Sequence, residues 1–125
     1  MSYTEARNEI NQQMDTCIQN CLDCFRTCLA TVSHCLNLGG VHGSQEHITI
    51  LLECAEVCQT SARLMLVQSS IHSDQCGVCA KACERCAEDC QSMGDGDEQM
   101  LKCAETCRRC AETCSEMAST TNAMS

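Results

Sequence analysis

Cysteine recurs in this chain at the spacing of one helix face. Residues 79–90 (CAKACERCAEDC) and 103–114 (CAETCRRCAETC) share the pattern C-A-x-x-C-x-x-C-A-x-x-C. Steps of four, three and four residues keep side chains on one side of an α-helix, which turns once in about 3.6 residues. Residues 17–28 (CIQNCLDCFRTC) repeat this spacing, and residues 54–65 (CAEVCQTSARLM) carry it with Ser61 and Met65 in the last two positions. The chain therefore contains four copies of one helix with a thiol face.

All 16 cysteines belong to these four thiol faces. Cys35 lies seven residues after Cys28, and Cys76 lies three before Cys79, so each extends a face by one more position. Because every thiol falls on the pattern, we take the whole set as candidate metal ligands: Cys17, Cys21, Cys24, Cys28, Cys35, Cys54, Cys58, Cys76, Cys79, Cys83, Cys86, Cys90, Cys103, Cys107, Cys110 and Cys114.

The remaining signals divide the chain into four helices. The sequence has no proline, so long helices can form without interruption. We expect helices over about residues 4–37, 45–70, 74–92 and 97–118. Local signals support these limits. Ser2 with Glu5 fits a capping box, and Ser44 and Asp95 with Glu98 are expected to cap two further helices. Glycine turns are expected at Gly39–Gly40–Gly43 and at Gly94 with Gly96. Short connections predict one all-α domain over residues 1–125, an antiparallel up-down four-helix bundle with a cysteine-lined core.

A second, aliphatic face accompanies the thiols on the first helix. Its members each follow the cysteine phase by one residue: Ile18, Leu22, Phe25, Leu29, Val32 and Leu36. The helix is therefore expected to bury a broad face, thiol on one flank and aliphatic on the other. Aliphatic faces on the first two helices are the candidates for an oligomer interface.

Composition narrows the class of protein. Val, Ile, Leu and Phe are only 20 of 125 residues, so a folded core needs cysteine as a small hydrophobe. A net charge of −9, one Phe, one Tyr and no Trp argue against a nucleic-acid partner. The N-terminal residues lack the pattern of a secretory signal, and no apolar run approaches the ~18 residues of a membrane span. We therefore expect a cytoplasmic protein with free thiols and no membrane partner.

The thiol-filled core favours Cu(I) over zinc. Soft thiolate and thioether ligands select Cu(I). If each thiolate bridges two Cu(I) ions and each ion takes two sulfurs, one copper per cysteine leaves the core neutral, as burial requires. Zinc would need four thiolates per ion, and about four ions would leave a charge near −8. A run of near-equivalent thiols predicts a store of many Cu(I) ions.

The ends of the bundle carry softer, neutral ligands. Antiparallel order brings Met14, Met65, His72 and Met117 to one end. Thioether and imidazole need no deprotonation at neutral pH, so these four residues are candidate ligands where copper enters. The opposite end carries Cys35, His47, Met93 and Met100, which can either close the core or form a second opening.

Repeated C-x-x-x-C pairs on all four helices, over roughly residues 14 to 117, resemble the cytosolic branch of the bacterial copper storage proteins. The resemblance implies a four-helix bundle, many Cu(I) ions on core thiolates, reduced cysteines and a homotetramer. Met and His ligands at an open end also occur in that family. Ser61 and Met65 depart from the pattern, where helix two lacks two thiols.

The sequence shows no nucleophile–base pair, phosphate loop or H-E-x-x-H motif, so we expect no enzyme. Copper homeostasis is the expected role, with copper ions, a copper chaperone or a low-molecular-weight thiol as partners. Three alternatives stay open: a store for zinc or another soft metal, a chaperone for a single copper ion, and a thiol redox sensor.

Overall fold

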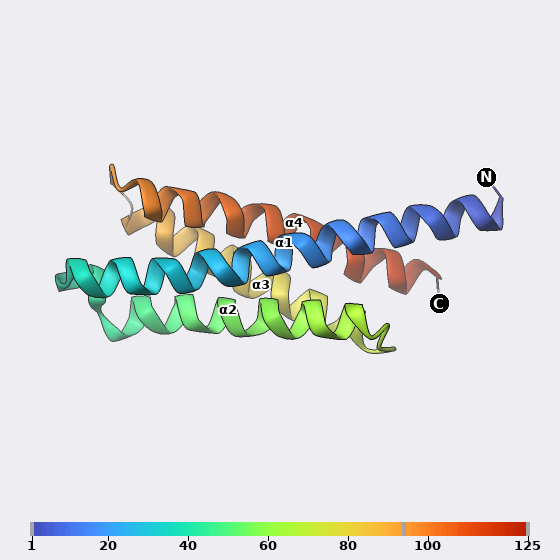
Figure 1. The fold of residues 1–125 in the computed structure, drawn as a ribbon, viewed down its shortest axis with the longest axis horizontal. Helices are drawn as coiled ribbons and strands as arrows, with labels where there is room; N and C mark the ends of the chain where they lie inside the picture. Colours follow the sequence, from blue (N-terminus) through green and yellow to red (C-terminus); the bar gives the residue numbers. More distant parts are fainter. Residues whose placement is uncertain (1, 94, 125) are drawn as a thin grey trace.

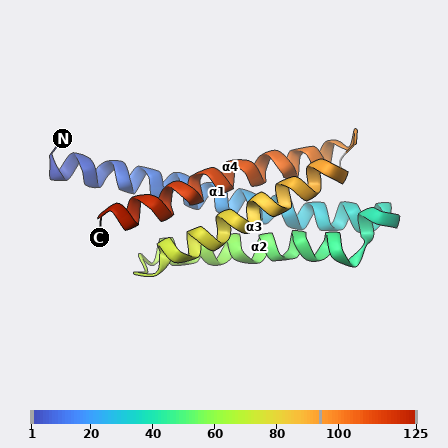
Figure 2. The same cartoon turned by 180° about the vertical axis from the view of Figure 1, so that it is seen from behind.

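The computed structural model describes residues 2–93 and 95–124 as a bundle of long α-helices (Figure 1). The elements are α1 (Tyr3–Leu38), the short 3-10 helix η1 (Gly40–Gly43), α2 (Gln45–Leu66), α3 (His72–Met93) and α4 (Glu98–Met124). Successive α-helices run in opposite directions, as the view from behind also shows (Figure 2). Helix α1 packs against α2 and α4, and α3 packs against the same two helices. The prediction of an all-α four-helix bundle is confirmed.

Local side-chain chemistry sets the starts of three helices. Ser2 and Glu5 form the predicted capping box at α1, and the Ser44 hydroxyl accepts a hydrogen bond from the His47 N–H at α2. At α4 the cap is Asp97, whose Oδ1 accepts from the Met100 N–H at 2.9 Å. The predicted cap at Asp95 is wrong, because Gly96, with φ +80°, still belongs to the turn. Gly94 lies outside the described residues.

The turn between α2 and α3 comes earlier than predicted. Helix α2 ends at Leu66 instead of residue 70, because Gln68 takes a left-handed conformation with φ +55°. The Gln68 N–H then bonds to the Met65 carbonyl at 3.0 Å, and the Ser69 N–H bonds to the Leu64 carbonyl at 2.9 Å. This pair of bonds is the Schellman closure of a helix. Helix α3 accordingly starts at His72, two residues before the prediction, and α4 continues past residue 118 to Met124.

Cysteine and alanine make up most of the core. All 16 cysteines are fully buried, so the four thiol faces point inward. Six alanines lie beside them and let the helices approach closely: Ala55, Ala62, Ala80, Ala87, Ala104 and Ala111. Larger buried side chains are few, chiefly Leu51, Met65, Met100 and Met117. A neutral thiol packs as a small apolar group, which is how a chain with few aliphatic residues fills its interior.

The aliphatic face of α1 is only partly covered by the other helices. Ile18, Leu22, Phe25 and Val32 are half-buried against the core. Leu29 and Leu36 on the same face remain 40% and 56% exposed. The prediction that this helix buries its aliphatic flank is therefore only partly correct within one chain.

Within residues 2–93 and 95–124, none of the helices combines the length and apolar character that crossing a bilayer requires.

Candidate metal-binding core

The centre of the bundle is a network of free thiols from all four helices. The Cys24 sulfur lies 3.7 Å from that of Cys54 and 3.6 Å from that of Cys107. The Cys54 sulfur also lies 3.7 Å from that of Cys83 on α3. These separations are well beyond a disulfide bond of about 2.05 Å, and all 16 cysteines are free. Thiols far apart in sequence are thus brought to contact distance without covalent links.

The same contacts continue along the bundle axis in both directions. Toward the N-terminus of α1, Cys21 and Cys17 each lie 3.6 Å from Cys114, sulfur to sulfur. Toward the C-terminus of α1, the Cys28 sulfur lies 3.9 Å from that of Cys103. The thiols therefore form one continuous array, called here the thiol ladder.

Groups of four thiols lie close enough to share a metal ion. Each group has its four sulfurs within 4.8 Å of one another, and every member is buried. Two such groups are Cys24–Cys28–Cys54–Cys107 and Cys24–Cys54–Cys58–Cys83. Because neighbouring groups share cysteines, the ladder suits bridged, polynuclear binding better than a row of separate sites.

Neighbouring thiols control one another's ionisation. Hydrogen bonding with Cys107 is the main cause that lowers the pKa of Cys24. Hydrogen bonding with Cys103 in turn is the main cause that raises the pKa of Cys107, and burial raises it further. One thiolate can thus be solvated by the S–H groups around it, while those groups keep their protons. A metal ion that takes several of these sulfurs must displace protons.

Two thiols toward the ends of the bundle core hold their protons firmly. Burial, followed by the negative charges of Asp97, Cys103 and Asp89, raises the pKa of Cys35 to about 11. For Cys76, hydrogen bonding to Cys114 lowers the pKa, but hydrogen bonding to Cys17 and burial outweigh it and raise the value to about 12. Both thiols are neutral at pH 7.

The residues predicted to be ligands at a copper entry site lie at one end of the bundle. Met65 and Met117 are buried in the core, and Met14 packs half-buried against it. His72, at the first turn of α3, is 8% exposed, and its Nδ1 atom is buried without a hydrogen-bond partner among the described residues. Ser61 is fully buried, and its hydroxyl donates to the Gln75 carbonyl at 3.5 Å.

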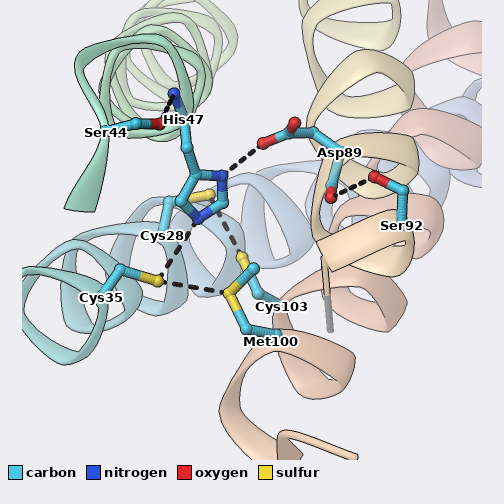
Figure 3. Close-up of polar contacts among 8 residues, drawn as sticks. All are labelled: Cys28, Cys35, Ser44, His47, Asp89, Ser92, Met100 and Cys103. Atoms are coloured by element: carbon cyan, nitrogen blue, oxygen red, sulfur yellow. Dashed lines mark hydrogen bonds and ion pairs between the residues drawn. The ribbon is translucent and has the colours of Figure 1, made fainter. Parts of the chain in front are cut away.

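The opposite end contains a polar cluster that sequence reasoning placed only in part (Figure 3). The Cys35 sulfur lies 3.3 Å from His47 Nε2 and 3.3 Å from the Met100 sulfur. His47 Nδ1 contacts the carboxylate of Asp89 on α3. The sequence placed Cys35, His47 and Met100 at this end but did not single out Asp89. In the sequence, Asp89 looks like one more acidic residue on the solvent-exposed face of α3.

The sequence profile of the copper storage proteins matches residues 10–119, which is most of the chain. The protein belongs to the copper storage protein family. This family stores metal and is not a family of enzymes. The membership confirms the resemblance drawn from the cysteine spacing.

Solved structures with the same bundle include copper-loaded proteins. A protein from Nitrosospira multiformis, Nmul_A1745, is 41% identical with a TM-score of 0.81, covering 88% of this chain and 98% of that one. The Cu(I)-bound copper storage protein BsCsp3 is 32% identical with a TM-score of 0.77, covering 85% and 98%. A cytosolic copper storage protein from Streptomyces lividans, solved with five coppers, is 27% identical with a TM-score of 0.84, covering 90% and 97%.

A curated relative is similar over a shorter stretch. The cysteine-rich protein YhjQ of Bacillus subtilis is 32% identical over 71 residues. The match spans 57% of this chain and 66% of YhjQ, just under two thirds of its length.

Proposed function

We propose that this chain stores many Cu(I) ions on the cysteines of its core. The thiol ladder is the observation that supports the proposal, because its members are free, buried and 3.5–4.0 Å apart in contacts such as Cys58–Cys83 and Cys110–Cys114. Two sulfurs bound to one copper at about 2.3 Å each would lie roughly 4 to 4.6 Å apart. The ladder therefore needs to spread only slightly to accept metal.

Copper storage would keep the core electrically balanced. Each Cu(I) replaces one proton, so a core of thiolates and Cu(I) in equal number carries no net charge. Copper homeostasis, including protection against free Cu(I), is the role that follows. Storage is proposed in the cytoplasm, where thiols stay reduced, and a copper chaperone or a low-molecular-weight thiol is the proposed exchange partner.

Copper is proposed to enter where Met14, Met65, His72 and Met117 lie. The support is chemical, since three thioethers and an imidazole are neutral ligands beside the first thiols of the ladder. The buried Nδ1 of His72, which has no hydrogen-bond partner within residues 2–93 and 95–124, also favours a ligand there. Replacing Met65 and Met117 with leucine keeps their volume and is expected to slow Cu(I) uptake while leaving the total bound almost unchanged.

A homotetramer is the proposed assembly. The resemblance to the cytosolic copper storage proteins implies it, and the exposed Leu29 and Leu36 on the aliphatic face of α1 offer a surface for it.

A zinc store is the second candidate, favoured by the four-thiol groups. Four sulfurs that converge within 4.8 Å resemble a tetrahedral zinc site. The sharing of Cys24 and Cys54 between groups works against it, because a structural zinc site normally keeps four ligands of its own. Charge works against it too, since divalent ions cannot neutralise a fully deprotonated ladder at four thiolates each.

The test is an anaerobic titration of the reduced, metal-free protein with Cu(I) against a competing chelator, with helicity followed by circular dichroism. Tight uptake of more than about ten Cu(I) per chain, with helicity already present, is expected for a preformed store whose thiolates bridge metals. Saturation at about one to four ions would point to zinc storage or to a chaperone instead. Helicity that develops only with metal would contradict the preformed bundle.

A further inference from the structure

A groove lies along the seam between α1 and α4, outside the thiol ladder. These two helices pack against each other in antiparallel order (Figure 1). The groove has a volume of about 430 Å³, which is within the roughly 300–1,000 Å³ of small-molecule sites. Its lining includes three cations, one carboxylate and two hydroxyl groups: Arg26, Lys102, Arg109, Asp23, Thr27 and Thr106.

The groove lies on the flank of α1 that faces away from the aliphatic residues. On α4, Lys102, Thr106 and Arg109 each come directly before a cysteine of the ladder, and Asp23 and Thr27 do the same on α1. The aliphatic residues of α1 come directly after the cysteines. Since each residue turns a helix by about 100°, the two sets lie on opposite flanks of the thiol face. An assembly through the aliphatic face therefore does not need to cover the groove.

Positive charge is concentrated in this groove, although the chain as a whole is acidic. Arg26, Lys102 and Arg109 are three of only eight lysines and arginines in a chain of net charge −9. Asp23 is the only acidic residue among the described residues that line the groove. Its carboxylate accepts a hydrogen bond from the Gln19 side chain at 3.0 Å. A hollow with an excess of positive charge attracts anions.

Two of the three cations have no carboxylate partner. Neither Arg26 nor Lys102 forms an ion pair with any side chain that the structure describes. Arg109 is paired with Glu105 on its own helix at 3.0 Å, but both side chains are more than half exposed. Exposed pairs of this kind contribute little, so an anion can compete for Arg109. All three cations are therefore available to a ligand.

The groove occupies the stretch of the seam between two direct hydrogen bonds from helix to helix. At one end, Gln99 Nε2 donates to Thr31 Oγ1 at 3.0 Å. Beyond the other end, Asn20 Nδ2 donates to Thr113 Oγ1 at 3.3 Å. Between them, the Thr106 hydroxyl donates to a carbonyl of its own helix. A ligand in the groove would add polar contacts between α1 and α4 along this stretch.

We propose that the groove binds a small polyanion, a molecule with two or more phosphate or carboxylate groups, through Arg26, Lys102 and Arg109. Lys102 and Arg109 are seven residues apart on α4, about 10 Å along the axis, and Arg26 adds a cation from α1. Guanidinium groups bind phosphate and carboxylate oxygens in pairs, and the ammonium group adds a point charge. The site goes beyond the proposed copper storage, because it uses none of the core thiols.

The first test is isothermal titration calorimetry of the reduced, metal-free protein at low ionic strength, since salt screens exposed charges. Pyrophosphate and citrate are the probes, one with phosphate groups and the other with carboxylate groups. We expect one ligand per chain, and the tighter of the two probes identifies the preferred anionic group. A protein that binds neither probe would overturn the proposal. Binding of a hexaglutamate peptide without binding of either small anion would overturn it too, in favour of an acidic protein partner.

The second test separates the groove from general attraction of anions. Arg26→Gln with Lys102→Gln is compared with Arg63→Gln with Lys81→Gln, which removes two positive charges from exposed residues of α2 and α3. We expect the groove pair to bind the tighter probe at least about 10-fold more weakly, because charged hydrogen bonds are lost. The control pair should bind nearly as the unmodified protein does. Equal weakening in both pairs would contradict a site in the groove.

The third test reverses the sign of the effect. Asp23→Asn removes the negative charge of the groove and keeps an oxygen that accepts from Gln19. We expect this variant to bind the tighter probe about threefold more tightly, as Coulomb repulsion across several ångströms of water predicts. Glu88→Gln, a matched loss of charge at an exposed residue of α3, should change the affinity much less. Equal affinities of the two variants would show that the anion does not lie beside Asp23.

Discussion

The number of copper ions that a cysteine of the ladder can bind is expected to depend on how many other thiols it contacts. Cys107 lies within 3.9 Å of Cys24, Cys28 and Cys54, sulfur to sulfur. Cys17, near the end of the ladder, lies 3.6 Å from Cys114, and no other sulfur among the described residues is recorded as close to it as the neighbours of Cys107 are to Cys107. If thiolates bridge copper ions, a central sulfur serves more ions than a terminal one.

This difference predicts unequal losses of copper. Cys107→Ser is expected to lower the number of Cu(I) bound by about two, because a hydroxyl is a poor ligand for a soft ion. Cys17→Ser is the matched control and is expected to lose about one ion at most. The anaerobic titration measures both. Equal losses in the two variants would show that copper does not bridge neighbouring thiols.

Ionisation of the thiols predicts how the metal-free bundle responds to alkali. An unfolded cysteine ionises near its ordinary pKa of 9.0, whereas Cys35 in the folded protein ionises only at about 11 and Cys76 at about 12. Both thiols have raised pKa values, so their contribution to stability is complete below pH 9 and is lost as pH rises through 11 to 12. The urea midpoint of the reduced, metal-free protein is therefore expected to be lower at pH 10.5 than at pH 7.5.

The Cys35→Ser variant isolates one part of this effect. It lacks the thiol that stays protonated between pH 9 and 11, so its midpoint should fall less over the same interval. A variant whose midpoint falls as much as that of the unmodified protein would contradict the assignment to Cys35.

Helix limits were predictable where a side chain alone decides them. Ser2, Glu5 and Ser44 cap helices as expected, because their hydrogen bonds reach only three residues along the chain. The end of α2 was not predictable in the same way. Residues 67–71, directly after Leu66, include no glycine or proline, and the closure depends on Gln68 taking a conformation that non-glycine residues rarely adopt.

The left-handed Gln68 predicts a stabilising substitution. Gln68→Gly removes the steric cost of φ +55° and is expected to raise the free energy of unfolding by about 0.5–1 kcal/mol. The same exchange inside α2, Gln59→Gly, should lower it by about 1 kcal/mol, because glycine weakens a helix interior. Urea denaturation of the metal-free protein measures both. A loss of stability at Gln68 would show that the side chain contributes more than its conformation costs.

The thiol faces were predictable from spacing alone, but the cluster at Cys35 was not. Cysteine periodicity identifies the inward side of each helix, and all 16 thiols are indeed buried. Contacts of Cys35 with His47 and Met100 join residues 12 and 65 positions apart. Only the packing of three helices determines those distances. The sequence therefore predicts that these residues share one end of the bundle, but it does not predict their contacts.

The whole molecule separates its proposed ligands by their position along the bundle axis. Thiols from all four helices fill the middle, where bridging needs many equivalent sulfurs. Thioether and imidazole groups gather at both ends, with Met65, His72 and Met117 at one and His47 and Met100 at the other. Proposed capture and release therefore belong to the ends, and proposed storage to the middle.

The exposed aliphatic face of α1 predicts that the protein assembles into a homotetramer. Leu29 and Leu36 are 40% and 56% exposed in a single chain, next to half-buried residues of the same face. Covering this face in a homotetramer would remove apolar surface from water, at about 25 cal/mol per Å². Light scattering after size exclusion is expected to give four times the chain mass of 13.6 kDa.

Charge placed on that face should dissociate the assembly. Leu29→Glu combined with Leu36→Glu is expected to reduce the mass toward 13.6 kDa with helicity unchanged, since both side chains already contact solvent in one chain. Leu66→Glu with Val67→Glu is the control: these residues are 61% and 72% exposed, at the α2–α3 turn and off the aliphatic face of α1. A dissociating effect of the control pair alone would move the interface to that turn. An unmodified protein with a mass of 13.6 kDa would contradict the tetramer itself, because no partner would then cover the leucines of α1.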